Sequence, residues 1–531
     1  MTLNSEVFHR TTAEVNTQIG SYFDVVDDAI KMSDTNKKYI IDAQSSYSPG
    51  PPIQAKSTTT FIISPTCDNT ADIYNGFIKA KLNCKFTIDT ALNGNLAVAA
   101  LNGHHFDRMW FGFKDAMDAV EKYEILSNGI NIYTQNLAPE ESFITACTTN
   151  ESVKRADAYS KVRHKDVWNQ KHAGCGAFVD WGTATTKDNV VIPLKIDLRR
   201  FLPLSNIKYL PAFAGKIELR IEFGTKGMVY TPCGPDMSLQ HDLHTMSEYT
   251  FPPITCEFKP IGEEITCYAL YAGNVFTAQQ RTCKVDDHFI TTEAYSVVPN
   301  FGIDNDVYQK LVSRYTGQEL IFPTQILTIS HMANVLGGGP GSSTTTQTPK
   351  FVDSIFVLLP LKPNYHTVFK NPGLNSCQLK CGGYGSIPNS AFSTNGDCTF
   401  IELCQNAFNV NGGQVGFNKD VLQSLIHVGY EDTAANTRAH LENDTYSHDR
   451  TNFVIGLPTE TDNTFQQGQH SNTPITYELA TNITANAYTA EASHPPPLLC
   501  FLQDQVISIH VQGNGMPPEV EIGPYDITSR S

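Results

Sequence analysis

An unbroken alternation of apolar and polar side chains constrains this chain more than any other feature. Successive side chains of a strand point to opposite faces of a sheet, so a period of two predicts a strand with one solvated face. Such half-exposed strands are typical of antiparallel sheets. The alternation is longest in GFIKAKLNCKFTID, where every second residue is apolar: Ile78, Ala80, Leu82, Cys84, Phe86 and Ile88.

The same period recurs along the rest of the chain. KIELRIEF at 216–223, TPITYEL at 473–479 and DQVISIHV at 504–511 all alternate. FVDSIFVLLPL at 351–361 is apolar nearly throughout, which predicts a strand covered on both faces. Helical periods are few and short, and we expect them at 115–126, 154–172 and 419–428. The predicted class is therefore mainly β, with short helices in the connecting loops.

A repeated phrase divides the chain into two halves. PPITCEF begins at Pro252 and PPLLCF begins at Pro496, and 496 − 252 = 244 residues is close to half of the 531-residue chain. In each half an alternating strand, a polar loop, the proline phrase and a further strand follow in the same order. This order predicts two tandem β-sandwiches, and the long strands and connections suit eight-stranded jelly rolls. Two lectin-like sandwiches with no particular mutual geometry would give the same signals. We expect an N-terminal arm at 1–56, a first jelly roll at 57–275 and a second with a C-terminal tail at 276–531.

Charge and composition narrow the function. The chain has 38 basic and 54 acidic side chains and a net charge of −16, which disfavours sequence-specific nucleic acid as a principal ligand. We find no secretory leader and no apolar run of about 18 residues, so we expect neither a signal peptide nor a transmembrane segment. The odd count of 13 cysteines favours reduced thiols and a protein made inside the cell.

Two stretches resemble a known family. VIPLKIDLRRFLPLSNIKYLPAFAGKIELRIEF at 191–223 and SIFVLLPLKPNYHTVFKNPGLNSCQLKCGGYGSIPNSAF at 354–392 are similar, in order and pattern, to segments of the first and second rolls of double jelly-roll major capsid proteins. That family belongs to double-stranded DNA viruses, and the likeness is greatest to its virophage and Polinton-like group.

The resemblance implies a structural protein of the virion, without catalysis or cofactor. Three chains would form a pseudo-hexagonal homotrimeric capsomer, and capsomers would tile an icosahedral shell together with penton or vertex proteins and minor capsid proteins. Two other readings stay open. The chain could be a two-domain carbohydrate-binding or carbohydrate-active β-sandwich protein, although its acids are dispersed and it has only three tryptophans. It could also be a minor shell component such as a vertex protein.

The sequence contains no G-x-S-x-G, no H-E-x-x-H and no complete P-loop. We expect GGGPGSSTTTQT at 337–348 to be a flexible loop between strands. We interpret the two histidines of HDLH at 241–244, and those at 104 and 105, as ordinary loop histidines rather than as parts of a metal or catalytic site. Four thiols are the best metal candidate, although buried free cysteines are the favoured interpretation: Cys377, Cys381, Cys398 and Cys404.

Residues 154–172 have a net positive charge in a chain that is otherwise acidic, because they contain six Lys or Arg and only two Asp. This basic patch could face the capsid interior and touch the genome or an acidic partner, or it could be a solvated loop helix. Its cations are Lys154, Arg155, Lys161, Arg163, Lys165 and Lys171. For the arm at 1–56, we expect it to clamp a neighbouring capsomer, and disorder is the alternative.

Overall fold

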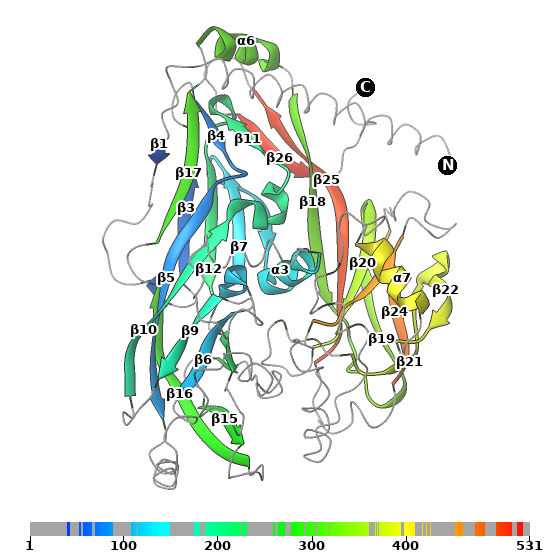
Figure 1. Ribbon diagram of the computed structural model, residues 1–531. Helices are drawn as coiled ribbons and strands as arrows, with labels where there is room; N and C mark the ends of the chain where they lie inside the picture. The colour runs from blue at the N-terminus through cyan, green and yellow to red at the C-terminus, as the bar shows by residue number, and fades with distance from the viewer. Residues whose placement is uncertain are drawn as a thin grey trace.

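The second half of the chain forms a complete jelly roll in the computed structural model (Figure 1). Eight consecutive strands form two sheets, ordered β18-β25-β20-β23 and β19-β24-β21-β22, and a ninth strand, β26 (Glu519–Gly523), joins the first sheet by pairing with β25. In both sheets the order is first, fourth, second and third along the chain, which is the jelly-roll arrangement. The strands are β18 Glu319–His331, β19 Gly339–Gln347, β20 Val352–Leu358, β21 Leu374–Cys381, β22 Ser386–Phe392, β23 Ile455–Pro458, β24 Ile475–Ile483 and β25 Leu498–His510.

The first half repeats this order. One of its sheets runs β3-β12-β7-β8, and in a larger sheet β2 pairs with β16, β16 with β5, and β5 with β10. Both are again first, fourth, second and third along the chain. The strands are β2 Ile53–Gln54, β3 Thr58–Ile63, β5 Phe77–Ile88, β7 Val120–Ser127, β8 Ile130–Gln135, β10 Thr186–Asp197, β12 Ile217–Phe223 and β16 Ala278–Ile290. The prediction of a mainly β chain with two tandem jelly rolls is confirmed.

The other elements extend or connect these sheets, except that four of the strands form a further sheet ordered β14-β13-β6-β9. The further strands are β1 Ile40–Asp42, β4 Asn69–Asp72, β6 Arg108–Phe113, β9 Cys175–Asp180, β11 Tyr209–Pro211, β13 Lys226–Tyr230, β14 Lys259–Pro260, β15 Glu264–Leu270, β17 Tyr295–Gly302 and β26 Glu519–Gly523. The helices are short: η2 Ala116–Ala119, α3 Ala138–Ala146, η4 Leu198–Arg200, η5 Leu202–Leu204, η6 Ala212–Ala214, α6 Asn305–Tyr315, η8 Gly382–Tyr384 and α7 Cys398–Ala407.

The structure describes part of the chain. Its described residues are 40–42, 53–54, 57–65, 69–88, 108–113, 115–148, 175–180, 186–224, 226–230, 259–260, 264–270, 278–290, 294–302, 305–317, 319–360, 367, 369, 371–394, 398–408, 417, 421, 425, 452–459, 473–483, 495–511 and 518–523.

The predicted alternation is present in the strands. Along β12 and β24, buried side chains alternate with partly or fully exposed ones at every position. Nearly every side chain of β20 is buried, as its continuous apolar sequence predicts. The alternating strands therefore each turn one face to a core and one away from it, which is the arrangement of a sandwich.

The helix expected at 115–126 is wrong. Asp115 and Asp118 form a capping box at the start of the single 3-10 turn η2, and β7 begins directly after this turn. β7 pairs with β12 on one side and β8 on the other. Pairing on both sides fixes β7 in the sheet, and its Tyr123 and Ile125 side chains are buried in the core of the first roll, so tertiary packing overrides a weak helical period.

The prediction of a loop at 337–348 is also wrong, because most of these residues form a strand. Gly339–Gln347 forms β19, which pairs with β24 at every position. Its one buried polar side chain, Ser343, donates to the Asn334 carbonyl oxygen at 2.6 Å and accepts from the Asn334 amide at 3.0 Å. Three consecutive threonines favour a strand once a partner strand is present, whereas composition alone resembles that of a loop.

The strand pairing bears on where the two rolls divide. The expected bounds, 57–275 and 276–531, stay a prediction. Since β16 and β17 both pair with β5, strands of the first roll continue as far as residue 302. Among the described residues, α6 lies in the chain between β17, whose partners are strands of the first roll, and β18 of the second roll.

Two hydrophobic cores are joined by the same long strands. Phe322 of β18 and Ile509 of β25 belong to the core of the first roll. Leu327 of β18 and Leu499 of β25 belong to the core of the second. Each of these 13-residue strands therefore runs from one core to the other, and α3 lies beside them in Figure 1.

Candidate functional site

The place where the two rolls meet is the most distinctive polar site among the described residues. We call it the roll junction and define it by six residues: Tyr123, Tyr133, Gln135, Glu141, Leu202 and Leu327. Five come from the first half, on β7, β8, α3 and η5, and Leu327 comes from β18. The junction therefore joins the sheets of the two rolls.

The helix α3 supplies the central residue. Pro139 lies in its first turn, where the missing amide hydrogen has no intrahelical acceptor to lose. Glu140 and Glu141 are also in the first turn, where negative charge interacts favourably with the helix dipole. Further along, Phe143 packs on Phe369 of the second half with ring centroids 4.7 Å apart. The helix is thus anchored in the second core while its first turn faces the first roll.

Glu141 has 0% exposure and accepts three hydrogen bonds. The Tyr123 hydroxyl donates to Oε1 at 2.7 Å, the Gln135 amide donates to Oε2 at 2.7 Å, and the Leu202 backbone amide donates to Oε1 at 3.3 Å. Burial raises the pKa of the Glu141 carboxyl to about 6, against the opposing effect of these donors. A carboxyl in this position changes its charge within the physiological range of pH.

The network continues into the second roll. The Gln135 amide also donates to the Leu327 carbonyl oxygen at 2.8 Å, and the Tyr133 hydroxyl donates to the same oxygen at 3.4 Å. A separate bond runs from the Thr324 hydroxyl of β18 to the Pro203 carbonyl oxygen at 2.8 Å. Buried polar groups need partners, so these bonds specify how β18 sits on the first roll.

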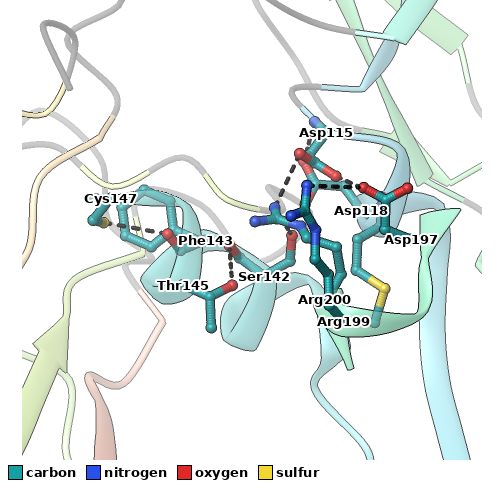
Figure 2. Close-up of polar contacts among 10 residues, drawn as sticks. Asp115, Asp118, Ser142, Phe143, Thr145, Cys147, Asp197, Arg199 and Arg200 are labelled. Carbon is teal, nitrogen blue, oxygen red and sulfur yellow. Dashed lines mark hydrogen bonds and ion pairs between the residues drawn. The ribbon is translucent and has the colours of Figure 1, made fainter. Parts of the chain in front are cut away.

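A charged cluster lies at the other side of α3 (Figure 2). Arg200 is 3.0 Å from the Asp115 carboxylate and donates to the Ser142 hydroxyl at 3.4 Å. Beside it, Arg199 is 3.6 Å from the Asp197 carboxylate. These contacts tie η4, η2 and α3 together. The two arginines and their carboxylates balance in charge, and each has a structural partner, so the cluster serves to position α3.

Three of the four candidate thiols are seen in the second core. Cys377 and Cys381 are buried on β21, and Cys404 is buried on α7. Cys404 accepts from the Gly456 amide at 3.3 Å, and burial raises the pKa of Cys377 and of Cys404 to about 12. Thiolates are the form that binds zinc, and burial disfavours them here. The side chain of Cys398 lies outside the described residues.

These thiols should resist alkylation in the native protein. At about pH 8 a thiol with a pKa near 12 has roughly 1,000-fold less thiolate than an ordinary cysteine, in addition to being inaccessible. We therefore expect iodoacetamide to label Cys377 and Cys404 only after unfolding in guanidinium, as read by peptide mass spectrometry. Rapid labelling of Cys404 in the folded chain would contradict the buried environment.

The remaining candidates lie outside the described residues. These are the basic patch, with Lys154, Arg155, Lys161, Arg163, Lys165 and Lys171, and the histidines at 104, 105, 241 and 244. The interior-facing role of the patch stays a prediction. Within the expected arm, the short strands β1 and β2 pair with β17 and β16. Clamping of a neighbour by the arm also stays a prediction.

The described residues contain neither a cluster of metal ligands nor a membrane-spanning helix. No group of three or more His, Cys, Asp and Glu side chains in them is placed to hold a metal ion. No helix among them has the length and apolarity needed to span a membrane.

The roll junction was missed by reasoning from sequence. Its one local signal was the acidic pair at 140–141 followed by apolar Phe143 and Ile144, which does not reveal burial.

Comparison with solved structures finds similarity over most of the chain. The mavirus major capsid protein is 11% identical with a TM-score of 0.47, covering 94% of this chain and 95% of that one. A chain of the Sputnik virophage structure is 9% identical with a TM-score of 0.44, covering 93% and 92%. The Faustovirus major capsid protein is 9% identical with a TM-score of 0.40, covering 93% and 98%. No protein-family model and no curated protein matches.

Proposed function

We propose that this chain is the major capsid protein of an icosahedral virus and that three copies form a pseudo-hexagonal capsomer. The observation that carries the proposal is the repeated strand order, because two jelly rolls of one topology follow each other in the chain. The resemblance of 191–223 and 354–392 to the two rolls of such proteins supports the same role.

Symmetry explains why two rolls in one chain suit a shell. Three chains related by a threefold axis close into a ring, and six similar rolls then approximate a hexagonal prism. Hexagonal prisms tile a surface, although the chain itself has no sixfold symmetry. The rolls must keep a constant relative position for this to work, and the strands shared between the cores together with the roll junction provide that rigidity.

The role needs no catalytic group and no cofactor. The net charge of −16 suits a shell that encloses a nucleic acid without gripping it. Penton or vertex proteins and minor capsid proteins would complete the shell, and the protein would be made and assembled inside the host cell and reside in the virion. Contacts within the trimer are expected to bury ~2,000 Å² or more, since the assembly would be obligate.

The mass of the purified protein in solution tests the proposal. Light scattering after size exclusion should give three times 58.6 kDa, about 176 kDa, and negative-stain images of that peak should show a compact pseudo-hexagon. A monomer that stays monomeric at high concentration, and that binds glycans on an array, would instead support the carbohydrate-binding alternative.

A further inference from the structure

A buried carboxyl lies where the two rolls meet, and the proposed shell function does not depend on its protonation state. Glu141 sits on a helix whose apolar side enters the second core, and its donors come from β7, β8 and η5. One of those donors, the Gln135 amide, also bonds to β18 of the second roll. The protonation state of Glu141 is therefore coupled to the contact between the rolls.

Other titratable groups surround this carboxyl. Burial raises the pKa of Tyr123 and of Tyr133 well above 10, and burial also raises the pKa of the Cys500 thiol. These three groups therefore stay neutral in mildly acidic and neutral solution. The titratable and charged groups on α3 and on the elements around it are Glu140 on α3, Glu121, Lys122, Tyr123 and Glu124 on β7, Tyr133 on β8, Asp115 and Asp118 at η2, Arg199 and Arg200 on η4, and Cys500 on β25.

We propose that Glu141 is a proton-binding switch, and that the roll junction opens less readily when this carboxyl is protonated than when it is ionised. The network can accommodate the proton. The Tyr123 hydroxyl also lies within hydrogen-bonding reach of Tyr133, so it can turn to donate there and accept from the new O–H of Glu141. The Gln135 amide keeps its acceptor, because the other oxygen of a carboxylic acid still accepts.

Burial decides which protonation state of Glu141 makes the roll junction more stable. A fully buried carboxylate has lost its water, and three donors replace that water only in part. The pKa of Glu141 is raised from 4.5 to about 6, so the folded form binds the proton more tightly than the unfolded form. The resulting stability is complete below about pH 4.5 and is lost as pH rises through about 6. The equilibrium constant for opening should therefore increase by roughly 30-fold in total, from well below pH 4.5 to well above pH 6.

Amide hydrogen exchange of the full chain tests this. Peptides covering α3 and β18 should exchange at about pH 7.5 from an opening equilibrium roughly 8-fold larger than at about pH 5, after correction for intrinsic rates. Glu141→Gln cannot titrate and should lose this pH dependence. The matched control is Glu140→Gln, which changes the neighbouring carboxyl of the same turn and should keep it.

A second variant serves if Glu141→Gln fails to fold. Tyr123→Phe retains the buried ring but removes one donor to the carboxylate, and that donor lowers the pKa of Glu141. The pH at which exchange changes should therefore move upward in Tyr123→Phe. A merely structural effect would raise opening equally at both pH values. The proposal is overturned if the wild type and Glu141→Gln share one pH dependence, or if Tyr123→Phe leaves the transition pH unmoved.

Discussion

Phe143→Ala is expected to lower the free energy of unfolding by about 3–5 kcal/mol, which is typical for removing a buried aromatic side chain. Phe143 is 6% exposed, and its ring packs on Phe369 with centroids 4.7 Å apart. Phe369 belongs to the second half and accepts a backbone bond from Phe453 at 2.9 Å, so α3 is anchored on ordered structure. The midpoint of guanidinium unfolding, followed by circular dichroism, measures the loss.

Thr145→Ala on the same helix is the matched control. Thr145 is partly exposed, and its hydroxyl donates to the Ser142 carbonyl oxygen of its own helix at 3.0 Å. Alanine favours a helix slightly, so we expect a change within about 0.5 kcal/mol. If Phe143→Ala unfolds at the same midpoint as this control, then α3 does not hold the second roll in place.

Gly456→Ala is expected to be destabilising by about 1–3 kcal/mol, because the site has no room for a methyl group. A Cβ at this position would lie 2.9 Å from the Ala407 Cβ and 3.2 Å from the Cys404 Cα. Both atoms are fixed to the backbone of α7, so the helix itself would have to move away from β23. The same movement would stretch the 3.3 Å contact between the Gly456 amide and the Cys404 sulfur.

Gly383→Ala provides the comparison for this substitution. No atom lies within 4 Å of the position its Cβ would take, and the residue is exposed. Its unfolding midpoint should stay close to that of the wild type. The iodoacetamide experiment gives a second readout for Gly456→Ala, since displacement of α7 should expose Cys404 to labelling. Equal midpoints for the two alanine variants would contradict the close packing of α7 on β23.

Reasoning from sequence failed where tertiary contacts override local preference. The apolar period of 115–126 suggested a helix, yet strands on both sides of β7 recruit these residues into a sheet. The Gly-, Ser- and Thr-rich stretch at 339–347 suggested a loop, yet it is paired along its whole length with β24. The partner of β19 and one partner of β7, β12, come from far away in the chain, and no local pattern reports them. The other partner of β7, β8, follows it across the Asn128-Gly129 turn, a local hairpin signal that the sequence reasoning missed.

The candidate site shows the same limit more strongly. Glu141 and Gln135 lie close in sequence, but the oxygen that joins them to the second roll belongs to Leu327. A charged residue in an amphipathic helix is ordinarily solvated, so the sequence contained no reason to expect a buried carboxyl there. Only the packing of α3 between two cores removes its water and raises its pKa.

The amino-acid sequence by itself determined the class of this protein, the face that each long strand buries and the presence of two similar halves. Alternation is a local property, since each side chain's direction follows from its neighbours in the strand. Tertiary structure alone decided the order of strands within each sheet, the passage of β18 and β25 from one core to the other, and the roll junction. These depend on contacts between distant residues, whose free energies exist only once the chain has packed.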